Sequence, residues 1–186
     1  MKYPIKYHII RILSFTIPKS IHVHRLERIE NKAKAIASKK NVPFIIRCKI
    51  LEEYEKKPNS LYSIGYSNQY EQMKDGKYDI FIYRQFVMHS EVELLKTIFH
   101  EFGHFIDYCT SIQTKKPLKK IYLCKKFPIK TKGSYEDHFA ELFALKMLDL
   151  ISIDPEVSII FEKIVKEGIQ NLSSESMKRS IDYSTL

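Results

Sequence analysis

The sequence predicts an α+β fold, in which helices and a small mixed sheet come from separate stretches of one chain. Apolar residues recur at helical spacing before residue 40 and again after residue 90. Between these stretches, β-branched and aromatic runs alternate with turn residues, which is typical of strands. The chain has 186 residues, 44% of them hydrophobic, and this is enough for a core of ordinary size.

Ser20 precedes the first predicted helix, and its hydroxyl can cap that helix. The apolar stripe of the helix lies opposite a face of Lys and Arg and consists of Leu26, Ile29, Ala33, Ile36 and Ala37. Residues 1–18 precede it as an arm that Pro18 closes. We therefore expect an N-terminal arm and helix over residues 1–40 and one domain over residues 41–186.

Strand-like runs follow this helix. Phe44 to Leu51 is the first, Leu61 to Tyr66 is the second, and Tyr70 marks a third. Lys74 to Lys77 has the hairpin dipeptide Asp-Gly at its centre and leads into a strand over Tyr78 to Tyr83. We expect this last strand to lie at an edge of the sheet, where an extended peptide could pair with it.

Helices resume at Ser90, which has Glu93 three residues later, the spacing of a capping box. This helix is expected to run to about Cys109. Its buried stripe is predicted to contain Leu94, Leu95, Ile98, Phe102, Phe105, Ile106 and Cys109.

Two more helices are predicted towards the C-terminus. One runs from Tyr135 to about Leu150. The other begins at Asp154-Pro155, a capping residue followed by proline at the first helical position, and is expected to stop at Gly168.

The connection before these helices is rich in lysine and has no acidic residue. It carries Lys115, Lys116, Lys119, Lys120, Lys125, Lys126, Lys130 and Lys132, and contributes much of the net charge of +9. The sequence predicts a solvated, mobile loop, while contact with phosphate, acidic lipid or an acidic substrate stays open as the alternative. The charge allows nucleic-acid binding, but no nucleic-acid motif accompanies it.

The three cysteines indicate a reducing compartment. Cys48, Cys109 and Cys124 are odd in number and lack C-x-x-C spacing, so a disulfide framework is not expected. His8 and Arg11 interrupt the apolar residues of the N-terminal arm, which predicts neither a good signal peptide nor a membrane span. We expect a cytoplasmic protein, with secretion left open.

One segment has the spacing of a metal site: His100-Glu101-Phe102-Gly103-His104. Histidines four apart on a helix point the same way, so both imidazoles can bind one zinc ion at about 2.0–2.1 Å. Glu101 is rotated round the helix and can act as general base towards a zinc-bound water. Gly103 costs the helix about 1 kcal/mol relative to alanine, but would let another backbone approach closely. The alternative is two partly buried histidines on an ordinary helix.

A catalytic zinc needs a third protein ligand, and the acids that begin the next predicted helix are the best placed. Asp137 and Glu141 are four apart and share a face, so one could bind zinc while the other holds a ligating histidine. Ser134 and Asp137 also have capping spacing, which needs no metal. Asp107 shares the face of the two histidines and is either a partner to one of them or plain helix surface.

The two segments together resemble the gluzincin peptidases. His-Glu-Phe-Gly-His-Phe-Ile-Asp, followed by Asp-His-Phe-Ala-Glu-Leu-Phe-Ala, is most similar to the anthrax-toxin-lethal-factor-like catalytic domains, and the Mlc titration factor peptidases carry a similar pair. The resemblance covers roughly residues 78–150. It implies a zincin-like domain, with one helix carrying the His-Glu-x-x-His motif and the following helix carrying the third zinc ligand.

In those families the second segment reads E-x-F-A-E or E-x-F-A, and its first acid is the third ligand. Aligning Phe139-Ala140-Glu141 places that acid at Asp137, one methylene shorter than glutamate, so the helix would have to lie closer to the metal. Glu136 would take its place if the helix began later, with His138 a weaker candidate, and Glu141 matches the second acid. The lethal-factor-like domains also carry a tyrosine, several residues before the third ligand, that stabilises the transition state. The corresponding position in this sequence is Lys130, and we do not transfer the role to the nearby Tyr135.

The sequence therefore predicts a zinc metallopeptidase that holds Zn²⁺ with His100, His104 and Asp137, uses Glu101 as general base, and acts on a peptide or protein. The Lys-rich stretch could favour acidic substrates. The alternative is a basic binding protein, for nucleic acid or an acidic partner, whose zinc is structural and closed by four protein ligands.

Overall fold

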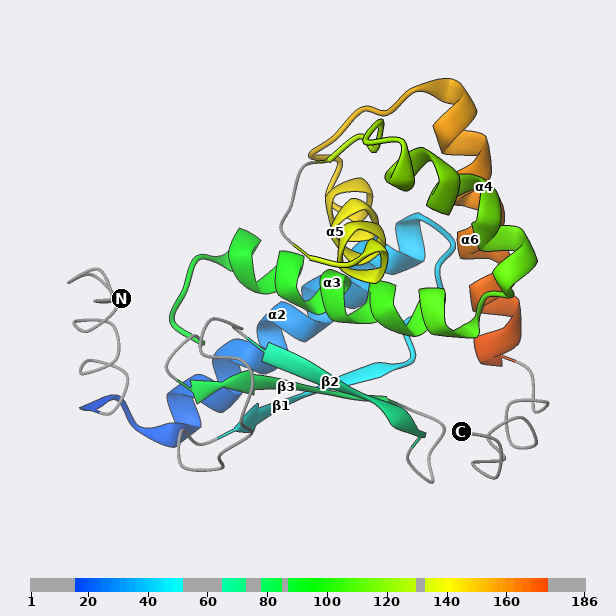
Figure 1. Cartoon of the computed structure of the whole chain (residues 1–186). Helices are drawn as coiled ribbons and strands as arrows, with labels where there is room; N and C mark the ends of the chain where they lie inside the picture. The colour runs from blue at the N-terminus through cyan, green and yellow to red at the C-terminus, as the bar shows by residue number, and fades with distance from the viewer. Residues whose placement is uncertain (1–15, 52–64, 73–77, 85–86, 130–132, 174–186) are drawn as a thin grey trace. The chain divides into compact units, whose positions relative to one another are not determined.

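The computed structural model describes residues 16–51, 65–72, 78–84, 87–129 and 133–173 (Figure 1). The described elements are α2 Lys19–Lys39, β1 Ile46–Leu51, β2 Gly65–Gln72, β3 Tyr78–Tyr83, α3 Glu91–Cys109, α4 Ile112–Leu123, α5 Tyr135–Met147 and α6 Pro155–Ser173. The α+β fold class and the small mixed sheet are confirmed. The expected turn at residues 74–77 and the strand residues 61–64 lie outside the described ranges.

The chain forms two compact units, residues 1–101 and residues 102–186, and the boundary between them along the chain falls within α3. The predicted boundary between residues 40 and 41 stays a prediction. Among the described residues, no helix has the length and apolar character needed to cross a membrane.

The sheet of the first unit has the order β1-β3-β2. β1 runs parallel to β3, and β2 runs antiparallel to it. The expectation that Tyr78–Tyr83 is an edge strand is therefore wrong, because both its sides are already hydrogen-bonded. Burial explains this position: Ile80 and Ile82 are fully buried, and Asp79 is buried with its charge paired to Arg47 and Lys49 of β1.

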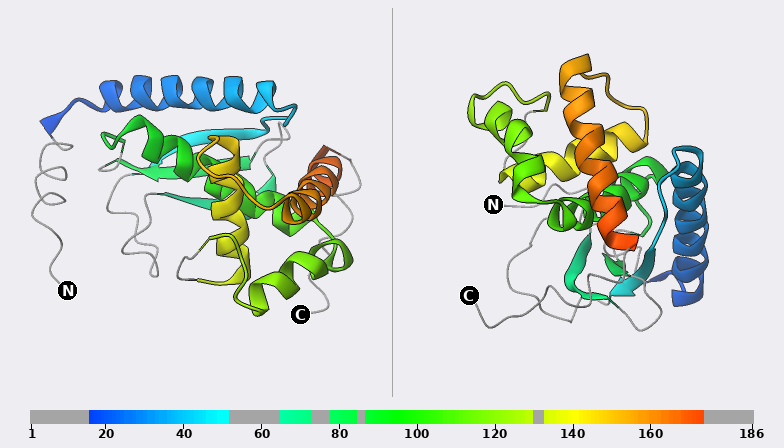
Figure 2. Two further views of the ribbon diagram at one scale, coloured as in Figure 1. Left: turned by 90° about the horizontal axis from the view of Figure 1, so that it is seen from above. Right: turned by 90° about the vertical axis from the view of Figure 1, so that its right-hand side faces the viewer.

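Helix α2 packs beside β1, as both views in Figure 2 show. Four residues of its predicted stripe, Leu26, Ile29, Ala33 and Ala37, are buried. The Cys48 amide of β1 donates a hydrogen bond of 2.7 Å to the Glu30 carboxylate of α2. The helix begins at Lys19 after Pro18, one residue before the expected Ser20 cap, and Ser20 makes no capping hydrogen bond.

The second unit contains a helix where the sequence predicted a loop. Helix α4 covers Ile112–Leu123, so the loop prediction is wrong for the first part of the Lys-rich stretch. The Ser111 side chain caps the helix by accepting from the Thr114 amide, and Leu118 is its buried residue. Glu167 of α6 accepts hydrogen bonds from the Ser111 amide and the Thr114 hydroxyl, which joins the two helices.

Helix α6 continues past Gly168 to Ser173, so the predicted stop is wrong. A Cβ at residue 168 would lie 2.5 Å from the Ile106 carbonyl oxygen and 2.9 Å from the Thr110 hydroxyl. This glycine is therefore needed where α6 crosses the second half of α3, rather than at a helix end. Nearby, Phe102 and Phe143 pack edge to face at 5.7 Å, and Phe139 lies 5.5 Å from Phe161.

Candidate metal centre

Helix α3 presents the two histidines one turn apart. Its start is the predicted capping box: the Ser90 hydroxyl accepts from the Glu93 amide, and the Glu93 carboxylate accepts from the Ser90 amide, both at 3.3 Å. The apolar stripe predicted for this helix is buried, except that Cys109 is half-buried. His100 and His104 are half-buried, and Glu101 is only 8% exposed.

Gly103 lets α5, the helix that carries Asp137, lie close to α3. A Cβ at residue 103 would lie 2.8 Å from the Cα of Ala140 and 3.2 Å from both the Ala140 carbonyl oxygen and the Phe143 Cβ. The predicted close approach of another backbone is therefore confirmed, and that backbone belongs to α5. Ala140 lies one turn after Asp137, so this contact determines how near Asp137 comes to His104.

Asp137 closes the capping box at the start of α5. Its Oδ2 accepts hydrogen bonds from the Ser134 amide at 2.8 Å and the Ser134 hydroxyl at 3.1 Å. The Ser134 hydroxyl in turn accepts from the Asp137 amide at 3.2 Å. The other oxygen, Oδ1, lies 3.8 Å from the Nε2 of His104. One carboxylate thus caps its helix and faces a histidine at the same time.

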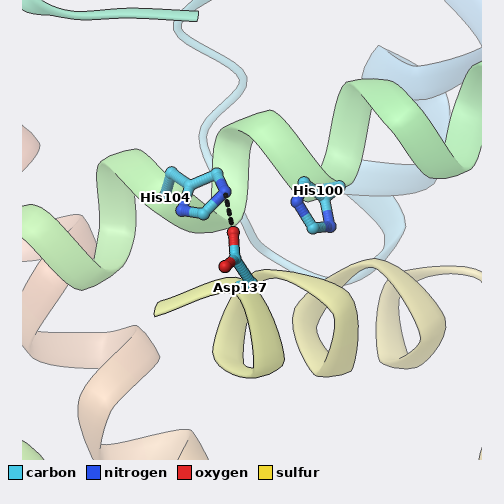
Figure 3. Close-up of side chains that lie close together, drawn as sticks. All are labelled: His100, His104 and Asp137. Atoms are coloured by element: carbon cyan, nitrogen blue, oxygen red, sulfur yellow. Dashed lines mark ion pairs between the residues drawn. The ribbon is translucent and has the colours of Figure 1, made fainter. Parts of the chain in front are cut away.

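His100, His104 and Asp137 form the group that could hold a metal ion among the described residues (Figure 3). One ligand atom from each lies within 4.8 Å of the other two. Ligands at 2.0–2.2 Å in tetrahedral zinc are about 3.4 Å from one another, so binding would require the ligand atoms to close by up to about 1.4 Å. Two imidazoles and a carboxylate are also a donor set that zinc accepts, so these residues fit the ion.

The other acids and the histidine of α5 are placed elsewhere. Glu136 lies 3.6 Å from the Lys119 ammonium of α4. Burial raises the pKa of Glu136, but hydrogen bonds from its own amide and from Ser134, with the charges of Lys119 and Lys115, outweigh this and lower it. Glu141 and Glu136 are outside the group that could hold a metal, and so is His138.

His138 belongs to an aromatic cluster that the sequence did not reveal. Its ring lies 4.8 Å from that of Tyr122 and 5.6 Å from that of Phe127, and both rings approach Tyr135. The Nδ1 of His138 is 2.8 Å from the Ser134 carbonyl oxygen, a geometry in which the protonated nitrogen donates. His138 therefore fixes the start of α5. The aromatic residues at positions 122, 127 and 135 are the one sequence feature from which this cluster could have been expected.

Asp107 is buried and paired with α4. The Lys115 ammonium donates to its carboxylate at 3.0 Å and to its backbone carbonyl at 2.9 Å. Burial raises the pKa of Asp107, and Lys115 opposes that shift without cancelling it. Asp107 Oδ1 and the Tyr135 hydroxyl are buried without a hydrogen-bond partner within the described part of the chain. Asp107 is thus not plain helix surface.

No family model, curated protein or solved structure matches this chain. The resemblance to the gluzincins therefore rests on the two short segments and on the placement of their residues.

Proposed function

We propose that this protein is a zinc-dependent metallopeptidase in which His100, His104 and Asp137 bind the ion and Glu101 is the general base. The observation that carries the proposal is the convergence of two imidazoles and one carboxylate, whose ligand atoms lie within 4.8 Å of one another. Three protein ligands are the number a catalytic zinc has, because the fourth position is left for water or substrate.

The exposure of the ligands favours an open site over a closed structural one. The Asp137 side chain is 44% exposed and the His104 side chain is 13% exposed, so solvent reaches the group from the side of α5. When bound, zinc would acidify a water molecule towards a pKa of about 7 and polarise a peptide carbonyl.

Glu101 supplies the proton transfers. It follows His100 directly, so helix geometry turns it about 100° away from the ligand face and leaves it out of the coordination set. A carboxylate there would take a proton from the attacking water and deliver it to the leaving amine. Glu101 as a residue is only 8% exposed, which shelters that exchange from bulk solvent.

An extended substrate cannot pair with β3, since β1 and β2 occupy both its sides. Such a substrate would pair with β1 or β2, the two edges of the described sheet.

The test is zinc content and peptide-library cleavage measured side by side for the wild type, Glu101→Gln and Glu136→Gln. Glu136 is the matched control, because it is a nearby acid outside the metal group. We expect about one zinc per chain in all three proteins. Cleavage should fall by about 10²–10⁴-fold in Glu101→Gln alone, the usual contribution of a general base.

Other outcomes would distinguish the proposed metallopeptidase from its alternatives. Zinc in every protein with cleavage in none would support the basic binding protein with a non-catalytic zinc. Absence of zinc from the wild type would refute the metal site itself.

A further inference from the structure

The start of α5 determines where the Asp137 carboxylate points. Ser134 holds its Oδ2 through two hydrogen bonds, at 2.8 Å from the amide and 3.1 Å from the hydroxyl. This leaves Oδ1 directed at His104, 3.8 Å away. The orientation is therefore set by the protein chain itself.

Gly133 leaves the space that this carboxylate occupies. A Cβ at residue 133 would lie 2.4 Å from the Asp137 Oδ2 and 2.9 Å from its Cγ. The φ angle of Gly133 is +147°, a backbone conformation that residues with a side chain rarely adopt. Any other residue there would displace either the backbone or the carboxylate.

Helix α4 and the aromatic cluster anchor these two residues. The Tyr122 hydroxyl donates to the Gly133 carbonyl oxygen at 3.1 Å. The Ser134 carbonyl oxygen lies 2.8 Å from the Nδ1 of His138, whose ring packs against Tyr122. The residues that hold Asp137 are thus themselves held from two sides.

We propose that Gly133 and Ser134 are positioning residues for the metal, which hold the Asp137 carboxylate in its ligating orientation before an ion binds. The inference rests on the proposed function, because it requires Asp137 to be a ligand. A carboxylate with a fixed rotamer loses less side-chain freedom on binding, so the affinity for metal rises. It also explains how a short aspartate serves here: one oxygen caps the helix and the other faces His104.

The experiment measures zinc affinity by competition with a chromophoric chelator, together with thermal unfolding of the metal-free proteins. The variants are Ser134→Ala, Ser134→Thr and Gly133→Ala. Ser90→Ala is the matched control, because it removes the equivalent hydroxyl from the capping box of α3, where Glu93 is no ligand.

We expect Ser134→Ala to weaken zinc binding about 10–100-fold, as loss of a partner that orients a ligand usually does. Ser134→Thr keeps the hydroxyl and should bind like the wild type, and Gly133→Ala should lose at least as much affinity as Ser134→Ala. Ser90→Ala should lower the melting temperature but leave zinc affinity unchanged.

Wild-type affinity in Ser134→Ala, with a lower melting temperature alone, would overturn the inference and leave the proposed metallopeptidase standing. Equal loss of affinity in Ser90→Ala and Ser134→Ala would also overturn it, because the effect would then be general helix destabilisation. A wild type that binds no zinc would overturn both the inference and the proposed function.

Discussion

Replacement of Gly103 by alanine tests the contact that brings α5 to the proposed metal ligands of α3. The added Cβ would lie 2.8 Å from the Ala140 Cα, about 0.6 Å short of the 3.4 Å at which ordinary contact begins. The obstacle is backbone, so it cannot rotate away as a side chain would. We expect α5 to move outward by roughly this amount at Ala140, one helical turn from Asp137.

Two opposing terms determine the effect on stability. Alanine favours the helix by about 1 kcal/mol over glycine, whereas overpacking of a buried contact costs about 1–3 kcal/mol. The net expectation is a free energy of unfolding lower by about 0–2 kcal/mol. For a chain of this size, that lowers the melting temperature by several degrees at most, since 1 kcal/mol corresponds to about 2–4 °C.

The effect on metal binding should be larger than the effect on stability. An outward shift of about 0.6 Å would be added to the closure of up to about 1.4 Å that tetrahedral ligation already needs. We expect zinc affinity to fall at least tenfold, by analogy with loss of a residue that orients a ligand.

Chelator competition and thermal unfolding measure the two effects separately. Gly168→Ala is the control, because its Cβ would meet Ile106 rather than the ligand helix α5. It should lose stability with a much smaller change in zinc affinity. A Gly103→Ala protein that is more stable than the wild type and binds zinc equally well would refute the reasoning.

Two further predictions concern buried charges. Burial raises the pKa of Asp79, but Arg47 and Lys49 outweigh this and lower it, so its contribution to stability is complete above pH ~5 and is lost as the pH falls through the folded-state pKa. Asp79→Asn should therefore lower the free energy of unfolding by about 1–3 kcal/mol at pH 7. Urea unfolding at a series of pH values should show this difference from the wild type disappear in acid. A difference that stays constant with pH would contradict this reasoning. Lys115→Met leaves the buried Asp107 charge without its partner and should cost about 3 kcal/mol at pH 7. Because the pKa of Asp107 is raised, that cost should shrink as the pH falls below the raised value, and Asp107→Asn in the same protein should recover most of it; no recovery would point to lost packing instead.

The local features of the candidate metal site could be predicted from the sequence. The spacing of His100 and His104 and the capping box at Ser90 each depend on a few neighbouring residues on one helix. Gly103 was expected to admit another backbone, but its partner, Ala140 of α5, could not be named from the sequence. The position of β3 could not, because an apolar run reads the same at an edge as in the centre of a sheet. The pairing with β1 and β2 that decides this involves residues distant in sequence.

Helix α4 was not predicted, because lysines dominate its sequence and because Pro117, a residue type that usually ends or kinks a helix, lies inside it. Leu118 is its one fully buried residue, so the apolar stripe is too narrow to be recognised as helical. Contacts with α6 stabilise it instead, and these become visible only in the folded chain. The pairing of Asp107 with Lys115 depends on this helix, which is why Asp107 could not be placed from the sequence.

Capping and metal binding were alternative explanations of Asp137 as long as only its spacing from Ser134 was known. A carboxylate has two oxygens, and each serves one purpose here: Oδ2 accepts from Ser134, and Oδ1 faces His104. The capping bonds fix the rotamer, and the approach of Gly103 to Ala140 fixes the distance. The short aspartate side chain is thus compatible with the proposed metal site, because α5 lies close to α3. The capping box does not itself require a metal, yet it orients the Asp137 oxygen that could bind one.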